Sequence, residues 1–483
     1  MRTLAFQDYP DRSLDSLTAF LSDCRERARE SGGFQIASIS LRVRNIDPLA
    51  VLESIFEPQE WHFYLERGAE GWALAGADEV VSCRLAGPER FRRAREFVRD
   101  ILERTVVIGD LELPFSGPHF FGGFTFFDSP GAGSPFPGGA LFLPRWQVSR
   151  STGGHCAVAN VKVAPEADIE ALAKKVWGAH ARFSAFDYAA PERNNSVVEL
   201  SRADPSAPGR EVVRDGALSF RDAVTDALEE IHRGRYRKIV LARAVDLSLD
   251  REINPLHALN GLRLRHPECY GYSLANGRGQ SFIGASPERL LRVRGGRLFT
   301  EALAGSAARG QGAAEDAYLG EKLFRSEKDL REHALVLESV CRRLRGAGLD
   351  PEPAEAPRLL SLPNVRHLQT PVEAPLPETV DIFTLLSVLH PTPAVGGTPR
   401  DAACAAIPRY EPFDRGLYAG PVGWVDYRGE GEFTVAIRSA LIGEGRARVF
   451  AGAGIVEGSD PEAEWRETEL KFRTLLEALT PPG

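Results

Sequence analysis

Several features that would assign this chain of 483 residues to a large class of proteins are missing from it. No run of 18 or more apolar residues occurs, which argues against a membrane span. The start, MRTLAFQDYPDRSLDSL, carries early acidic residues and no apolar core, so we expect no signal peptide. The six cysteines are far apart and form no C-x-x-C pair, which favours reduced thiols over a disulfide framework or a zinc site. We therefore expect a cytoplasmic protein and, by its size, an enzyme.

The motifs of several common enzyme classes are also missing. The chain has no G-x-x-x-x-G-K-[ST] phosphate loop, no H-E-x-x-H zinc motif and no G-x-S-x-G nucleophile turn. Residues 452–458 read G-x-G-x-x-x-G, one residue off the dinucleotide fingerprint, and no βαβ unit of suitable length follows them. The net charge is −8 with both signs interspersed, which gives no nucleic-acid footprint. These observations disfavour a nicotinamide dehydrogenase and a nucleic-acid-binding protein.

What is present predicts a globular α/β or α+β fold. Hydrophobic residues make up 43% and charged residues 26% of the chain, which is ordinary for such proteins. Residues 1–205 mix strand-like runs such as FQIASISLRVR with a basic helix at PERFRRAREFVRDILERT. The polar stretch 202–216 reads as a linker, and 215–477 opens with a helix and the strand KIVLARAVDL. We expect the second region to carry the chemistry.

The segment 459–471, SDPEAEWRETELK, concentrates charge on one predicted helix face. Glu464, Glu467 and Lys471 stand at i, i+3 and i+7, so their side chains project the same way. This arrangement suits an anionic ligand bound together with a metal ion. The same pattern is also typical of a solvated helix, in which the Glu467–Lys471 pair contributes about 0.2–0.5 kcal/mol.

The beginning of this helix can be placed from its neighbours. Ser459 and Glu462 have capping-box spacing, and Pro461 suits a first helical turn. Upstream, VFAGAGIVEG reads as an apolar strand that runs into a glycine turn. We expect the bare amides of AGAG to lie in that turn and to meet the ligand.

Two further segments offer an acid and a base. Lys238 opens an apolar strand, where partial desolvation would lower the pKa of a lysine and let it act as a base. A lysine that extends along the strand end to water would look the same. Glu288 ends FIGASPE, where a loop enters the hairpin predicted at Gly295 and Gly296. Among apolar neighbours its carboxyl could keep a proton and serve as a general acid, although an ordinary surface glutamate is the alternative.

A third carboxylate could join the acidic helix. Ser326 and Asp329 give a capping-type start to a long helix, and Glu332 lies beside its apolar stripe. Glu332 could therefore point inward and meet Glu464 and Glu467 around a hard cation such as Mg²⁺, which prefers oxygen ligands. A solvated helix face is again the alternative.

Basic and rigid segments complete the candidate site. LHPTPAVGGTP at 389–399 is fixed by prolines and paired glycines, and such irregular loops often contact substrates. His367 and Arg438 are isolated basic residues on strand-like runs. Taken singly, each is more typical of a core or surface residue; taken together they suit a dicarboxylate substrate.

Residues 215–477 closely resemble the chorismate-utilising enzymes, and among them the isochorismate synthases. The resemblance rests on these blocks, in family order: KIVLAR, FIGASPE, EALAGSAARG, SEKDLREH, HLQTP, LHPTPAVGG, EPFDRGLYAGPVGW, AIRSA, FAGAGIVEGSDPEAEWRET and Lys471. FFGGFTF and FLPRW resemble the longer, menaquinone-type members. The resemblance implies a single large α/β domain with two stacked sheets flanked by helices.

The resemblance also implies roles for residues. Lys238 matches the base that activates water for attack at C2 of chorismate, and Glu288 matches the acid that protonates the departing C4 hydroxyl. Glu332, Glu464 and Glu467 match the carboxylates that hold Mg²⁺. The residues implied in substrate binding are Ala304, Gly305, Ser306, His367, Tyr418, Arg438, Gly452, Ala453, Gly454 and Lys471. A downstream enzyme that consumes isochorismate is the implied functional partner.

Sister activities on the same scaffold remain as alternatives. Aminodeoxychorismate synthases carry a nucleophilic lysine where this chain has Ala304, and anthranilate synthases differ at HPTPAVGG and need ammonia. Salicylate synthases also eliminate pyruvate, and Tyr418 stands where some isochorismate synthases have Phe. A non-catalytic protein that binds small anions is the alternative from another class, and the presence of Lys238 and Glu288 argues against it.

Overall fold

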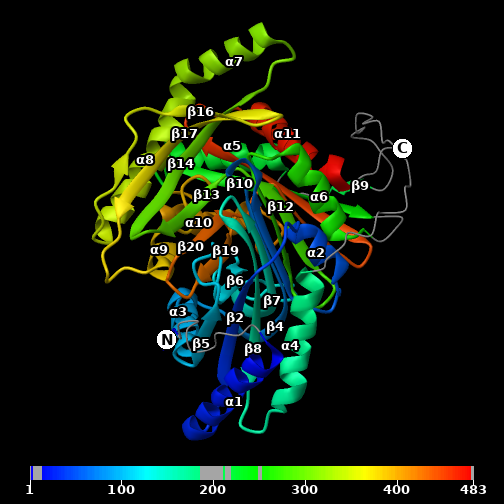
Figure 1. Ribbon diagram of the computed structural model, residues 1–483. Helices are drawn as coiled ribbons and strands as arrows, with labels where there is room; N and C mark the ends of the chain where they lie inside the picture. The colour runs from blue at the N-terminus through cyan, green and yellow to red at the C-terminus, as the bar shows by residue number, and fades with distance from the viewer. Residues whose placement is uncertain (1, 4–12, 185–209, 213–218, 249–252, 480–483) are drawn as a thin grey trace, which may run out of the picture.

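The fold combines helices with mostly antiparallel β-structure in similar amounts, as expected of an α/β or α+β protein. A computed structural model describes residues 2–3, 13–184, 210–212, 219–248 and 253–479. Within these residues 22 strands form one continuous hydrogen-bonded network (Figure 1). All described pairings are antiparallel except β1–β5 and β2–β5. The described part of the chain has no helix that is long and apolar enough to cross a membrane.

The network divides at β7, whose one edge pairs with β4 and whose other edge pairs first with β6 and then with β8. The first branch, in spatial order, is β1 (Arg2–Thr3), β5 (Thr105–Gly109), β2 (Gln35–Arg42), β8 (Gly154–Val163), β7 (Gly139–Ser151), β4 (Trp72–Leu85), β3 (His62–Arg67), β11 (Tyr270–Ala275), β12 (Ser281–Ser286), β21 (Ser439–Gly443), β22 (Arg446–Val456) and β10 (Lys238–Ser248), with β9 (Arg210–Val212) and β18 (Gly397–Thr398) on the far edge of β10.

The second branch leaves β7 through β6. Its strands, in spatial order, are β6 (His119–Phe124), β19 (Pro421–Asp426), β20 (Gly431–Val435), β13 (Arg289–Arg294), β14 (Arg297–Ala308) and β17 (Val365–Pro375), with β15 (Glu352–Pro353) and β16 (Arg358–Ser361) on the far edge of β17. The two branches pack face to face over the main hydrophobic core, where Phe63 of β3 stacks on Phe121 of β6 at 4.6 Å. The expected two stacked layers are therefore present, and they are joined through β7.

Helices cover the outer faces of both branches. They are α1 (Leu14–Ser31), α2 (Pro48–Ser54), α3 (Arg90–Glu103), α4 (Ile169–Ser184), α5 (Phe220–His232), α6 (Pro255–Arg265), α7 (Ala313–Arg325), α8 (Glu327–Gly346), α9 (Ile382–Leu389), α10 (Arg400–Tyr410) and α11 (Pro461–Leu479). α5 and α11 pack on β22, and α8 packs on β14. α1 and α4 pack together at one end of the molecule, while α7 projects at the other end (Figure 1).

The two sequence regions share both branches of the sheet. β3 of the first region pairs with β11 of the second, and β6 pairs with β19. Most of the expected linker, 202–216, lies outside the described residues, but its segment Arg210–Val212 forms β9 and pairs with β10. The two regions therefore cannot be separated without breaking strand pairs.

Two local predictions around α11 were wrong in detail. Asp460 caps the helix, since its Oδ1 accepts from the backbone N–H of Ala463 at 2.8 Å, so the capping box predicted at Ser459 is displaced by one residue. Ser459 instead donates to Glu464 Oε1 at 2.8 Å. AGAG is not a turn: β22 continues to Val456, and the chain turns afterwards at residues 457–458. The strand propensity of the flanking apolar residues outweighs the two glycines.

Candidate active site

Most of the predicted site residues gather around one cleft between the carboxyl-terminal helix and the edges of both sheet branches. Those that line it are Glu288, Ala304, Gly305, Ser306, Glu332, His367, Tyr418, Arg438, Gly452, Gly454, Glu467 and Lys471. The walls also include Val240, Ala394 and Val395. The loop predicted at 389–399 thus contributes to the cleft, as expected.

Lys238 lies just behind this wall, at the first residue of β10. Its side chain is 1% exposed, and its Nζ donates to Glu332 Oε1 at 2.8 Å. Glu332 comes from α8, whose start is capped by Ser326 as predicted. A buried ammonium needs such a partner, because an isolated charge in the interior is very costly. The predicted inward orientation of Glu332 is therefore confirmed.

Gly454 makes room for this pair. A Cβ atom on Gly454 would stand 2.5 Å from Glu332 Oε1 and 3.0 Å from Lys238 Cε. On the same strand a Cβ on Gly452 would stand 2.8 Å from the Tyr418 hydroxyl. The glycines thus let the strand approach the functional side chains closely.

The same strand also presents backbone groups to the cleft. Val240 and Ala242, the β10 residues opposite Gly454 and Gly452, direct their N–H groups away from β22. Gly452 and Gly454 are therefore in non-hydrogen-bonded pairs, and their own amides point away from β10. The carbonyl oxygen of Gly452 accepts from Lys471 Nζ at 2.8 Å on that side. Ala453 between them is in the main core and does not line the cleft.

Glu288 is the buried acid of the cleft. It is 3% exposed, and its backbone carbonyl accepts from Thr434 Oγ1 at 2.7 Å and from the Val435 N–H at 3.1 Å. Burial, and secondly the Glu301 carboxylate, raise the pKa of Glu288 to about 8, although Lys238 and Lys471 act in the opposite direction. A carboxyl with this pKa is protonated near neutral pH, as a general acid must be. Gly295 and Gly296 form the predicted hairpin between β13 and β14 that follows Glu288.

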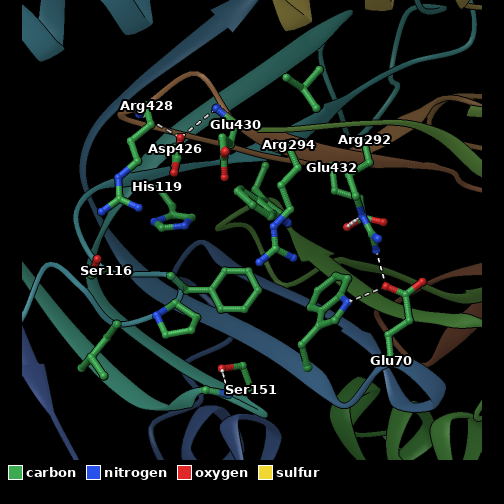
Figure 2. A pocket seen from close by; sticks show the side chains of 18 of the residues that line it. Glu70, Ser116, His119, Ser151, Arg292, Arg294, Asp426, Arg428, Glu430 and Glu432 are labelled. Atoms are coloured by element: carbon green, nitrogen blue, oxygen red, sulfur yellow. Dashed lines mark hydrogen bonds and ion pairs between the residues drawn. The ribbon is translucent and has the colours of Figure 1, made fainter. Parts of the chain in front are cut away.

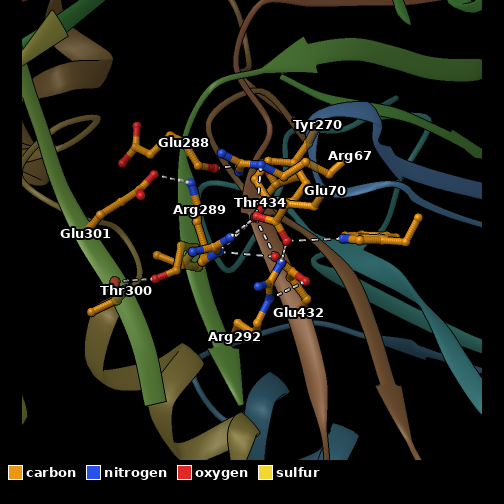
Figure 3. A network of polar contacts seen from close by, with 12 residues as sticks. Arg67, Glu70, Tyr270, Glu288, Arg289, Arg292, Thr300, Glu301, Glu432 and Thr434 are labelled. Carbon is orange, nitrogen blue, oxygen red and sulfur yellow. Dashed lines mark hydrogen bonds and ion pairs between the residues drawn. The ribbon is translucent and has the colours of Figure 1, made fainter. Parts of the chain in front are cut away.

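A network of charged side chains lies behind Glu288 (Figure 3). Glu301 accepts from the Arg289 N–H at 3.0 Å and from Gln369 Nε2 at 2.7 Å. Arg289 in turn reaches Glu432 at 3.1 Å and Glu70 at 2.7 Å. Sequence reasoning missed Glu301; its position as the first residue of the block EALAGSAARG was the available signal.

His367 and Arg438 form a pair at the cleft wall. Arg438 NH2 and His367 Nε2 are 2.8 Å apart, and His367 Nδ1 lies 3.0 Å from Ser306 Oγ. Since a guanidinium can only donate, Nε2 accepts and the imidazole proton sits on Nδ1. Burial and the adjacent guanidinium hold the pKa of His367 well below its ordinary value, so the ring is neutral. Arg438 has φ of 50°, a strained conformation of the kind that clusters at functional sites.

The three predicted metal-binding carboxylates each hold a lysine. Besides Glu332, Glu464 Oε1 accepts from Lys328 Nζ at 2.7 Å, and Glu467 Oε1 accepts from Lys471 Nζ at 2.7 Å. Burial and the neighbouring Glu467 raise the pKa of Glu464. Burial alone would raise the pKa of Glu467, but Lys471, with smaller contributions from Lys328 and Lys238, lowers it.

These carboxylates are not gathered as a finished metal site. No group of three or more His, Cys, Asp or Glu side chains in the described part of the chain is placed to hold a metal ion. The donor set nevertheless suits a hard cation, since each carboxylate already binds a positive charge through one oxygen. Sequence reasoning missed Lys328; it stands one helical turn before Glu332 in SEKDLREH.

A larger hollow elsewhere has none of the predicted residues (Figure 2). Its volume is about 470 Å³, and its lining combines Trp72, His119 and Trp424 with charged residues such as Arg292 and Asp426. Burial raises the pKa of Asp426 to about 7. Its Oδ1 accepts from the N–H groups of Arg428 and Glu430, so the role of this buried carboxyl is to hold the β19–β20 turn. The smaller cleft, where acid and lysine meet, is the better candidate for chemistry.

The chain is similar over nearly all of its length to known proteins. Residues 19–480 match the family described as "Chorismate binding enzyme". The chain belongs to the chorismate-binding enzyme family. It is 36% identical over 452 residues to the salicylate biosynthesis isochorismate synthase of Pseudomonas aeruginosa, covering 93% of this chain and 91% of the relative. It is 35% identical over 462 residues to the isochorismate synthase MenF of Bacillus subtilis, covering 94% and 95%.

A solved structure of a chorismate-binding enzyme agrees with the fold. The structure of MenF, the menaquinone-specific isochorismate synthase from Escherichia coli, superposes with a TM-score of 0.72 at 27% identity, covering 95% of this chain and 100% of that one. The resemblance drawn from the motifs is thus confirmed at the level of family and fold.

Proposed function

We propose that this chain is an isochorismate synthase that converts chorismate to isochorismate without releasing pyruvate. The observation that carries the proposal is a buried carboxylic acid that lines the cleft and is protonated near neutral pH, together with a buried lysine, Lys238, that is paired with Glu332 just behind the cleft wall. The names of the two nearly full-length relatives support it.

In the proposed reaction water adds at C2 of chorismate while the C4 hydroxyl leaves and the ring double bonds shift. Lys238 accepts a proton from the attacking water, and the ammonium that results is stabilised by Glu332, whose Oε1 lies 2.8 Å from Nζ. Glu288 donates its proton to the departing hydroxyl, so that water leaves. A general acid and a general base each typically contribute about 10²–10⁴-fold in rate.

The remaining residues bind and orient the substrate in this proposal. Chorismate carries two carboxylates, and Arg438, Lys471 and the free amides of Gly452 and Gly454 are donors that face the cleft. Tyr418, stacked on Phe450 at 5.1 Å, supplies an apolar wall. Ala304 carries no nucleophile, which disfavours chemistry through a covalent lysine adduct.

Mg²⁺ is the proposed cofactor, held by Glu332, Glu464 and Glu467. When bound it would neutralise a substrate carboxylate and orient the ring. The support is the oxygen donor set: Glu332 and Glu467 line the cleft, Glu464 lies one helical turn from Glu467 on α11, and each of the three carboxylates already holds a cation.

The setting of the enzyme is also proposed. The proposed location is the cytoplasm. The proposed partner is a downstream enzyme that consumes isochorismate, because an interconversion that is close to reversible depends on removal of its product. The salicylate biosynthesis relative from P. aeruginosa and the menaquinone-specific enzyme from E. coli cover 93% and 95% of this chain, so the long N-terminal region does not separate a salicylate pathway from a menaquinone pathway.

Product analysis tests the proposal. Purified protein with chorismate and Mg²⁺ should give isochorismate on chromatography, with no pyruvate in a coupled assay and no need for glutamine or ammonia. Pyruvate formed in a one-to-one ratio with consumed chorismate would instead identify a lyase. Unchanged chorismate would favour a binding protein.

A further inference from the structure

Lys328 is a lysine that the proposed reaction does not use, and its ammonium group reaches a buried carboxylate next to the candidate site. Of the three lysines paired with Glu332, Glu464 and Glu467, Lys238 is the proposed base and Lys471 also holds the carbonyl of Gly452. Lys328 makes no second hydrogen bond of this kind within the described residues. Its Nζ donates to Glu464 Oε1 at 2.7 Å.

The pair joins two helices that are distant in sequence. Lys328 lies in the first turn of α8, four residues before Glu332, and Glu464 lies in the first turn of α11. The Glu464 side chain is 2% exposed and that of Lys328 is 33% exposed, so the carboxylate is buried while the lysine reaches it from the surface. A buried carboxylate without a cation would be costly, and Lys328 supplies that cation.

The second oxygen of Glu464 is left for another partner. Oε1 accepts from both Lys328 Nζ and Ser459 Oγ, at 2.7 and 2.8 Å. Within the described part of the chain no hydrogen bond is made to Oε2. Glu464 is thus held in place by one oxygen while the other is available to a second cation.

We propose that Lys328 is the resting counter-ion of Glu464 and that it sets the affinity of the cleft for a divalent cation by competing for this carboxylate. The proposal rests on the proposed function in taking Mg²⁺ as that cation. Whether Lys328 leaves Glu464 or stays beside it when Mg²⁺ binds, its positive charge opposes the second cation. Lys328 is in this sense a positioning residue that acts through Glu464.

Removing this charge should strengthen cation binding. Because Lys328 is one-third exposed, water screens its effect, and we expect Lys328→Met to bind Mg²⁺ roughly 3- to 10-fold more tightly than the wild-type chain. Lys328→Arg keeps the charge and should stay within about twofold of wild type. Lys322→Met is the matched control: Lys322 is exposed on the neighbouring helix α7, and its loss should leave the affinity unchanged.

The experiment is calorimetric titration of Mg²⁺ into each purified full-length variant without substrate, with melting temperatures recorded alongside. Mg²⁺ should raise the melting temperature of Lys328→Met more than that of the wild type, because the ion replaces the missing counter-ion. Equal or weaker Mg²⁺ binding by Lys328→Met, or a gain of affinity in Lys328→Arg as large as that in Lys328→Met, would overturn the proposal and leave a purely structural contact.

The outcomes separate this inference from the proposed function. A wild-type chain that makes isochorismate and binds Mg²⁺, with Lys328→Met unchanged, would contradict only the role of Lys328. A wild-type chain that makes isochorismate but binds no Mg²⁺ would contradict the metal and with it the role of Lys328. Absence of isochorismate would contradict the reaction itself, while the Mg²⁺ titrations could still support the competition.

Discussion

At the scale of single residues, the proposal depends most on Glu288, which lines the cleft, and on Lys238, which lies just behind the cleft wall on Glu332. Lys238→Ala and Glu288→Gln should each lower kcat for isochorismate formation by roughly a hundredfold or more, since each removes one proton-transfer group. The check is steady-state kinetics on folded variants, compared with Glu355→Gln on the exposed surface. Near-wild-type turnover of either variant would remove that residue from the mechanism.

The pKa of Glu288 makes a second prediction at this scale. The acid works only when protonated, so with a pKa of about 8 it is competent at neutral pH, and kcat/KM should fall as the pH rises above that value. Glu301→Gln removes a negative charge that raises this pKa, so the fall should begin at lower pH. An unchanged pH profile in Glu301→Gln, measured beside Glu355→Gln, would exclude Glu301 from this tuning.

Some residues of the candidate site could be predicted from the sequence and others could not. Lys238 and Glu288 could be found because each stands at one end of an apolar run, where a titratable group is partly removed from water. Lys328 could not, because a lysine in the first turn of a charged helix looks solvated until α11 is packed beside it. Ser459 was predicted as a cap and proves to be a Glu464 partner for the same reason: a hydroxyl can satisfy a backbone or a side chain, and only the fold decides.

At the scale of elements, β22 places its glycines against the functional side chains. Gly454→Ala would bring a Cβ to 2.5 Å from Glu332 Oε1, so either the Lys238–Glu332 pair or the strand must move. We expect a loss of at least about tenfold in kcat/KM, since small displacements of catalytic groups are costly. Gly346→Ala at the end of α8 meets no atom within 4 Å and is the control. Equal activity of the two variants would contradict the close approach.

The element-level predictions failed where local signals competed. Two glycines in AGAG suggested a turn, but pairing along the whole of β10 keeps the segment extended. The helix of 459–471 was found, while its cap fell on Asp460, the next residue with a suitable side chain. Boundaries set by a single hydrogen bond are harder to predict than a face set by several side chains.

At the scale of the whole molecule, both sequence regions build one sheet network. The resemblance predicted two stacked layers, but the junction at β7 depends on pairings between residues far apart in sequence and has no local signal. The region 215–477 holds all predicted site residues, and yet its strands β11 and β19 pair with β3 and β6.

A fragment of residues 215–483 should therefore not yield a folded enzyme. Without β3 and β6 it would expose two strand edges and the apolar surface that covers Phe63 and Phe121. Expression of the fragment beside the full chain, followed by circular dichroism and an activity assay, checks this. A soluble, active fragment would show that the two regions fold independently.

In the proposed reaction water attacks C2 while Glu288 expels the C4 oxygen, and pyruvate is retained. Running the reaction in water labelled with oxygen-18, followed by mass spectrometry of the separated product, tests this. We expect isochorismate that carries one heavy oxygen at C2, with no pyruvate released. Isochorismate without the label, or consumption of chorismate with release of pyruvate, would contradict the proposed reaction.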